Sequence, residues 1–373
     1  MPSHQPKERI ITDSFRDLSL RLCTSMTFRE ATETINRFLH RCQGKEVKLK
    51  TYMDFCSRTG NALENEINNH SSDILKNAGF DPKTGKPTGE ISEKYKSKSS
   101  CYQDISVIQS TAEKYNSSHT ESDEKILLIK ESQFEAESES VYVSVDDVGV
   151  KHQKEHRNPE YEKNTVYVQN TVSVIKTSQY SHILTNVGQH TTIRNTLADL
   201  IEHDLLNNKH LIFLTDGAKD IRKNINEVFG FRQYTIILDW YHLKKKCQEY
   251  LSMSVKGGKE ARNIILQKLL RILWTGNIDN AENYLNNLSD KDLRTQNKIR
   301  ELCAYFEKNR DYIPCYALRD MLSLKNSSNR VEKANDLVVA KRQKHNGMSW
   351  SSLGSGAIAQ IQAYFINCHN SAA

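Results

Sequence analysis

Three acidic residues stand at positions where a carboxylate could bind a catalytic metal ion. Asp146 follows a run of alternating valines, Asp216 follows the apolar run HLIFLT, and Glu332 lies near the start of a C-terminal helical segment. Strand ends in open α/β sheets face the crevice where ligands bind. Carboxylates there suit hard divalent cations, and two such ions can activate an attacking hydroxyl and stabilise the leaving oxygen of a phosphoryl transfer.

Each acid also has an ordinary structural explanation. An Asp-Gly pair after a strand usually forms a turn, and a glutamate in the first turn of a helix complements the helix dipole. Two nearby acids compete with the assigned ones: Asp147 is adjacent to Asp146, and Asp336 lies four residues after Glu332 on the same helical face. Strand alternation favours Asp146, because it places this side chain on the face opposite the valines.

The elements that must position the acids form an α/β region that begins near residue 138. Three consecutive β-rich runs, SVYVSVDDVGV, NTVYVQNTVSVIKT and YSHILTNVG, predict an antiparallel meander. A helix, the strand HLIFLT, the helix IRKNINEVF and the strand QYTIILDWYH follow. A long helical stretch then fills about 243–325, and a last helix covers roughly 329–345.

The N-terminal part, residues 1–69, is predicted to be a helix-turn-helix DNA-binding region. Thr27 and Glu30 have the spacing of a capping box, and apolar residues follow at intervals of three and four. After a glycine-containing break, the second helix would enter the major groove and present Lys48, Lys50 and Arg58 to DNA. A plain helical hairpin without a role in DNA binding is the alternative.

The composition changes again between the two predicted domains. Residues 70–137 are rich in Ser, Lys, Glu and Thr with little apolar periodicity, which predicts a polar, partly disordered linker before the domain at 138–373. Charge is also uneven: 21 basic and 12 acidic residues from position 241 onward give +9, whereas the first 240 residues carry −3. A basic C-terminal half fits a polyanion partner, although a solvated helical surface explains it equally well.

The spacing of the cysteines and the hydropathy of the sequence indicate the cellular compartment of the protein. The eight cysteines are far apart and form no CxxC pair, which favours reduced thiols over disulfides or a structural zinc site. No apolar run approaches the ~18–20 residues of a membrane span, and the N-terminus lacks the apolar core of a signal peptide. We therefore expect a cytoplasmic protein, nucleoid-associated when bound to DNA, with no membrane partner.

As a set, these motifs resemble those of DDE-type insertion-sequence transposases of the Mutator-like group. The segments VYVSVDDVGV, FLTDGA, LDWYHL and NRVEKANDLVVAKRQKHNGMSW carry the resemblance, within about 138–365. It implies an RNase H-like mixed sheet with a helical insertion before the last catalytic helix. It also implies that Asp146, Asp216 and Glu332 are the catalytic residues and the ligands of Mg²⁺, with Mn²⁺ as an alternative. Asp147 is a departure, because the family often has glycine there.

A fourth motif, LDWYHL, matches a segment that follows the fifth strand in this group. The resemblance places His242 near the acids, where it could hydrogen-bond a carboxylate or phosphate and orient it, with Asp239 in the same supporting layer. Direct metal binding by His242 is disfavoured because Mg²⁺ prefers oxygen ligands. A histidine satisfied by backbone groups is the alternative.

The last helix is basic around Glu332. Its cationic side chains would neutralise DNA phosphates, and Trp350 would stack on an unpaired base unless it packs in the core. The residues expected to contact DNA here are Arg330, Lys333, Lys341, Arg342 and Trp350.

The resemblance implies a transposase of a bacterial insertion sequence. Such a protein binds the terminal inverted repeats of its element, cleaves DNA with a metal ion and joins the freed 3′ end to target DNA. Its partners are double-stranded DNA and a second copy of the chain, because two ends must be assembled. The alternatives are a non-catalytic, decayed or domesticated DNA-binding protein and an RNase H-like structure-specific nuclease.

Overall fold

A five-stranded mixed sheet forms the centre of the computed structural model, which describes residues 12–41, 44–96, 102–127, 129–130, 133–154, 166–289, 291–344 and 348–371. The strand order is β3-β2-β1-β4-β5. The first three strands pair antiparallel, which confirms the predicted meander, and β4 and β5 join β1 in parallel. The strands are β1 (Ser140–Lys151), β2 (Tyr167–Lys176), β3 (Ser181–Val187), β4 (His210–Thr215) and β5 (Thr235–Leu238).

Helices cover both faces of this sheet. The alternating valines Val141, Val143 and Val145 are buried against α5 (Gln189–Glu202) and α6 (Lys219–Phe229). On the opposite face, Val148 and Val150 pack against the C-terminal helices. These are α12 (Asn329–Asn335), a π-helical turn (Asp336–Ala340), α13 (Lys341–Gln343) and α14 (Ser352–Ser371).

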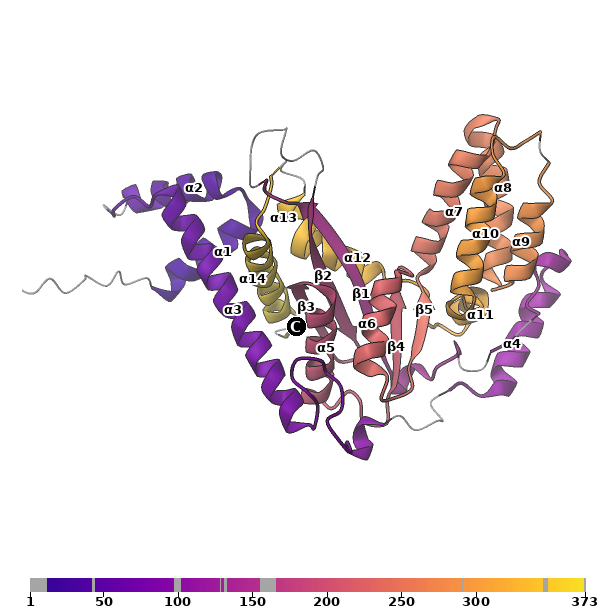
Figure 1. The fold of residues 1–373 in the computed structure, drawn as a ribbon, viewed down its shortest axis with the longest axis horizontal. Coiled ribbons are helices and arrows are strands. Elements are labelled where there is room, and N and C mark those ends of the chain that lie inside the picture. The colour runs from indigo at the N-terminus through magenta and orange to yellow at the C-terminus, as the bar shows by residue number, and fades with distance from the viewer. Residues whose placement is uncertain are drawn as a thin grey trace, which may run out of the picture.

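A helical arm occupies the stretch where an insertion was expected, between β5 and α12 (Figure 1). Its helices share one apolar core, which reaches the sheet through Ile212, Leu214 and Ile237. The helices are α7 (Trp240–Ser254), α8 (Gly258–Trp274), α9 (Ile278–Asn286), α10 (Asn297–Asn309) and α11 (Tyr316–Met321). Short 3₁₀ turns occur at Glu93–Tyr95, Ser122–Glu124, Glu137–Glu139 and Arg310–Tyr312.

The N-terminal region contains three helices, α1 (Asp13–Ser25), α2 (Phe28–Arg41) and α3 (Leu49–Asn77). The capping box is present: Thr27 N–H donates to Glu30 Oε2 (3.0 Å), and Glu30 N–H donates to Thr27 Oγ1 (3.2 Å). Helix α3 does not end at residue 69 but continues along α14 and α5 (Figure 1). The predicted boundary at 69 is therefore wrong.

The segment 70–137 is also not a linker in its described parts. Leu75, Phe80 and Tyr95 are buried in the core beneath α5 and α6. Further along, α4 (Ile105–Ser117) buries Ile108 against α11 of the arm. The polar composition was misleading because the segment contributes single apolar residues to cores built mainly by other elements. Within the described ranges, none of the helices combines the length and apolar character that crossing a bilayer demands.

Candidate active site

Three aspartates lie where the parallel pairing of the sheet ends: Asp216 and Asp239 follow β4 and β5, whereas Asp146 lies within β1, just past its last residue paired with β4. In the parallel register, Val145 of β1 pairs with Thr215 of β4, and Thr215 pairs with Leu238 of β5. The residue after each of these three registered residues is an aspartate: Asp146, Asp216 and Asp239. The side chains therefore form a row across β1, β4 and β5, because registered residues lie side by side.

Asp146 lies in a mostly buried position that disfavours its charged form. Burial and the nearby charges of Asp216 and Asp147 raise its pKa from 3.8 to about 6, although His242 and a hydrogen bond from Asp147 N–H (2.8 Å) act in the opposite direction. Asn335 Nδ2 on α12 donates to Asp146 Oδ2 at 2.7 Å. A carboxyl group with a raised pKa beside another carboxylate is typical of functional sites.

Asp216 begins the turn between β4 and α6. Its Oδ1 accepts a hydrogen bond from Ala218 N–H (2.8 Å). Gly217 has φ +84°, and a Cβ at this position would lie 2.7 Å from Leu238 Cδ1. The Asp-Gly pair thus forms the turn that its sequence suggests, and this turn also holds the carboxylate at the sheet edge.

Glu332 reaches the site from α12 and lies next to His242 of α7. His242 Nε2 is 3.6 Å from Glu332 Oε1, too long for a hydrogen bond, and this buried nitrogen has no hydrogen-bond partner among the described residues. Burial raises the pKa of Glu332, and the charge of Asp239 adds to this, whereas His242 and Lys245 lower it. His242 therefore interacts electrostatically with both Asp146 and Glu332.

Asp239 connects the two helices that carry His242 and Glu332. Its fully buried carboxylate caps α7 by accepting from Tyr241 N–H (2.7 Å) and His242 N–H (3.3 Å). It also accepts hydrogen bonds from the backbone N–H and the hydroxyl of Ser328, the residue before α12. Asp239 therefore positions other side chains.

The two competing acids face elsewhere. Asp147 points to the α5 side of the sheet, where Thr171 Oγ1 (2.6 Å) and Gln189 Nε2 donate to its carboxylate. Asn224 Nδ2 in turn donates to Gln189 Oε1 (2.8 Å). Asp336 is exposed at the start of the π-helical turn, whereas Glu332 is half-buried. The geometry favours Asp146 and Glu332 over these two acids. Asp146 belongs to the row of aspartates, and Glu332 interacts with Asp239 of that row.

Two residues expected to contact DNA are buried in the core. Arg342 is 2% exposed, donates through Nε to the carbonyl of Cys23 (2.7 Å) and stacks over Trp350. Trp350 is 4% exposed and packs against Phe28. Both predictions are wrong for this structure. The segment that carries Arg342 and Trp350 packs against α1 and α2, and the periodicity of strands and helices does not predict this contact.

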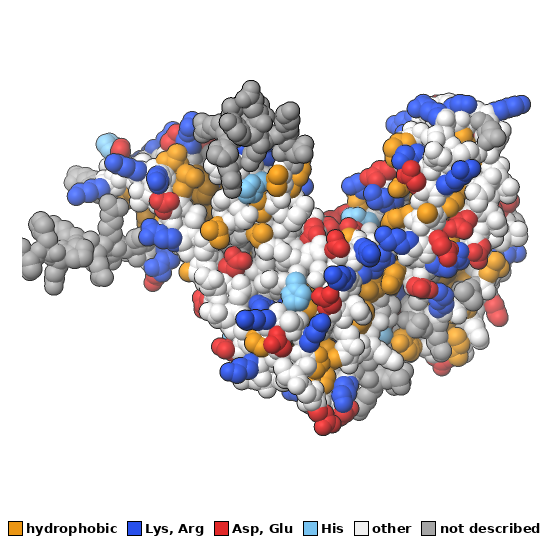
Figure 2. Space-filling model, viewed as in Figure 1, with side chains coloured by type: hydrophobic (Ala, Val, Ile, Leu, Met, Phe, Trp, Pro, Cys, Tyr) orange, Lys and Arg blue, Asp and Glu red, His pale blue; other side chains and the backbone are white. Residues whose placement is uncertain are grey.

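The other predicted DNA contacts are compatible with a surface role. The lysines and arginine expected at the surface are exposed, and they are Lys48, Lys50, Arg58, Lys333 and Lys341. The side chain of Arg330 lies outside the described residues. Figure 2 shows a notch between the arm and the rest of the molecule, with acidic side chains and histidine at its floor and basic side chains along the arm. Lys244 and Lys245 of α7 are exposed.

Sequence reasoning missed the neutral residues that hold the acids. Asn335 lies three positions after Glu332, so helical spacing alone would have put it near the site. Gln189 and Thr171 carry no comparable signal, because amides and hydroxyls are common and their partner Asp147 is distant in sequence. A separate group of potential metal ligands, Asp199, Glu202 and His203, was also missed.

The acid site fits the magnesium ion that the transposase resemblance implies. Asp146, Asp216 and Glu332 provide oxygen ligands, which Mg²⁺ prefers. Among the described residues, no lysine or arginine forms an ion pair with any of the three. Burial, and after it the charges of Asp216 and Asp147, raise the pKa of Asp146, and a bound cation would stabilise its charged form.

Comparisons with known proteins do not assign a family. No family model matches the chain, and no curated protein matches it. Among solved structures, the chain is similar to the Drosophila P element transposase strand transfer complex, with 8% sequence identity, 98% of this chain and 82% of that chain covered, and a TM-score of 0.26. A TM-score of this size does not establish a shared fold.

Proposed function

We propose that this protein is a metal-dependent DNA phosphoryl transferase of the DDE transposase type with an RNase H-like catalytic domain. The observation that carries the proposal is the position of Asp146 and Asp216 after registered residues of adjacent parallel strands, with His242 beside Glu332 and acting electrostatically on Asp146. Among common protein chemistries, converging carboxylates without a cationic partner fit divalent-metal phosphoryl transfer best.

Each side chain has a distinct role in this proposal. Asp146, Asp216 and Glu332 would hold Mg²⁺ or Mn²⁺, which supplies charge stabilisation and an activated oxygen nucleophile at a phosphodiester. Asn335 orients Asp146 through its 2.7 Å hydrogen bond. His242 would orient Glu332 once their present 3.6 Å separation closes to a hydrogen bond, and Asp239 fixes the start of α7 against α12.

DNA would lie in the notch between the arm and the sheet. Exposed lysines on α7, together with Lys333 and Lys341, would neutralise phosphates near the acids. Lys48, Lys50 and Arg58 at the exposed start of α3 would contact the element's terminal repeats. Joining two DNA ends in one complex would require at least two copies of the chain.

A donor plasmid tests this function directly. The purified full chain is incubated with Mg²⁺ and a supercoiled plasmid carrying the DNA that flanks its coding sequence on both sides. We expect strand cleavage at the ends of inverted repeats, 3′-hydroxyl products and joining of these ends to a second plasmid. Cleavage without joining would instead favour a nuclease, and binding of the repeats without cleavage in Mg²⁺ or Mn²⁺ would favour a non-catalytic DNA-binding protein.

A further inference from the structure

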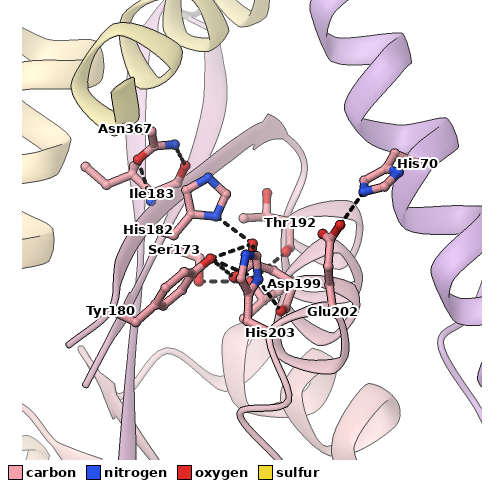
Figure 3. Close-up of polar contacts among 11 residues, drawn as sticks. His70, Ser173, Tyr180, His182, Ile183, Thr192, Asp199, Glu202, His203 and Asn367 are labelled. Atoms are coloured by element: carbon pink, nitrogen blue, oxygen red, sulfur yellow. Dashed lines mark hydrogen bonds and ion pairs between the residues drawn. The ribbon is translucent and has the colours of Figure 1, made fainter. Parts of the chain in front are cut away.

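A second cluster of metal-ligating side chains lies on the far part of the sheet, at the C-terminal end of α5 (Figure 3). One oxygen each of Asp199 and Glu202 and one ring nitrogen of His203 lie within 4.8 Å of one another. The three residues have the spacing i, i+3, i+4 around the last turn of α5, so their side chains share one face.

Histidines from two other elements converge on the same carboxylates. His182 Nδ1 of β3 is 2.6 Å from Asp199 Oδ1, and His70 Nε2 of α3 is 2.7 Å from Glu202 Oε1. Figure 3 shows both rings turned toward the end of α5. Three imidazoles and two carboxylates thus meet where α3, β3 and α5 approach one another.

Asp199 is held in place but is not neutralised by a permanent cation. Its carboxylate is 6% exposed, and no lysine or arginine of the described residues forms an ion pair with it. Tyr180 donates its hydroxyl hydrogen to Asp199 (2.8 and 3.0 Å), and burial together with this carboxylate raises the pKa of Tyr180. The tyrosine therefore stays neutral, and among the described residues the ion-pair partners of Asp199 are His182 and His203.

Asp199 and Glu202 of this cluster line a cavity through which an ion could enter. The cavity has a volume of about 740 Å³ and lies between α3, α14, β3 and α5. His70, His182, Asp199 and Glu202 line it, together with Glu66 and apolar side chains. Glu202 and His203 are also exposed at the surface, where Glu202 contacts His70 and His203 Nδ1 contacts the backbone carbonyl of Asp199 (3.0 Å), so metal binding would replace contacts of exposed side chains.

We propose that Asp199, Glu202 and His203 form a binding site for a divalent transition-metal ion of the zinc class, separate from the acid site. Mixed imidazole and carboxylate ligands favour Zn²⁺ and similar ions over Mg²⁺, and three protein ligands leave one position for water. Tyr180 and His182 orient Asp199, as groups behind a metal ligand do. When the metal binds, His70 gives up its contact with Glu202 and either occupies the open coordination position or moves away. The proposal does not depend on the proposed function.

Calorimetric titration of the full chain with Zn²⁺ tests this site. Excess Mg²⁺ is included to occupy the acid site, which prefers the harder cation. We expect one Zn²⁺ per chain, and a loss of affinity of more than about tenfold in Glu202→Gln and in His203→Ala. Glu66→Gln, which changes a carboxylate on the same cavity outside the cluster, should bind Zn²⁺ like the unmodified chain.

Thermal unfolding of the same proteins separates metal binding from damage to the fold. Without Zn²⁺, Glu202→Gln should melt like the unmodified chain, because its side chain is exposed. Added Zn²⁺ should raise the melting temperature of the unmodified chain and of Glu66→Gln, but not that of Glu202→Gln. Equal Zn²⁺ affinity in all four proteins, or no stoichiometric binding to the unmodified chain, would overturn the proposal.

Discussion

Asp146 of β1 and Asp216 after β4 follow a registered pair, Val145 and Thr215, and thus lie side by side at the edge of the parallel part of the sheet. Burial raises the pKa of Asp146 and the charge of Asp216 adds to this, so the two carboxylates interact through their charges. This relationship is costly to the folded protein unless a cation offsets it, and it leads directly to a test by pH and by metal.

The raised pKa of Asp146 predicts that Asp146→Asn stabilises the protein above pH 6. The folded chain retains a proton on Asp146 between about pH 4 and 6 that the unfolded chain has lost, so stability decreases as pH rises through this window. The asparagine variant lacks this loss and should gain about 3 kcal/mol at pH 7. Urea unfolding at pH 5 and pH 7 measures the difference. A variant that is less stable than the unmodified chain at pH 7 would contradict the raised pKa of Asp146.

Asn335→Ala should slow DNA cleavage by roughly 10- to 100-fold with little change in DNA affinity. The substitution removes the 2.7 Å hydrogen bond that orients Asp146, an effect comparable to the loss of a group behind a metal ligand. Asn195→Ala, which changes another buried asparagine bonded to Asn68 and Asn186, is the matched control. Similar slowing in both variants would indicate a general effect on folding.

His242→Ala is expected to reduce the single-turnover cleavage rate by roughly 10- to 100-fold while DNA binding is retained. The imidazole Nε2 lies 3.6 Å from Glu332 Oε1, and His242 also interacts electrostatically with Asp146, so both carboxylates would lose a neighbouring polar group. If His242 instead only fixes the start of the arm, the melting temperature should fall and activity should decrease in proportion to the folded fraction. Measuring both properties on one preparation distinguishes the two roles.

Trp350→Ala should destabilise the protein by about 3–5 kcal/mol, because it empties a core position next to Phe28 and Arg342. We expect the DNA affinity of the folded protein to be unchanged. Lys341→Ala, on the exposed side of the same segment, should show the reverse: normal stability, weaker binding and a salt dependence reduced by about one phosphate contact. Urea unfolding and salt titrations of binding provide the measurements.

The strands and the acids were predictable because local patterns determine them. Alternating valines specify β1 and place Asp146 on the opposite face, and an apolar run ending in Asp-Gly specifies β4 and its turn. The burial of Arg342 was not predictable, because its hydrogen-bond partner, the carbonyl of Cys23, is 319 residues away. The prediction of a linker at 70–137 was wrong for the same reason. Phe80 and Tyr95 contribute to a core built mainly by the sheet and by α5 and α6.

The most direct test of the central claim is single-turnover cleavage of a labelled duplex carrying the element's end by the unmodified chain, Asp146→Asn, Asp216→Asn and Glu332→Gln. DNA affinity is measured on the same preparations, and Asp147→Asn and Asp336→Asn are the matched controls. We predict that the three substitutions, and EDTA, abolish cleavage while DNA affinity is retained, because each amide keeps the side-chain shape but removes a charge that holds the metal. The two controls should cleave. Cleavage by any of the three variants at the rate of the unmodified chain would contradict the account.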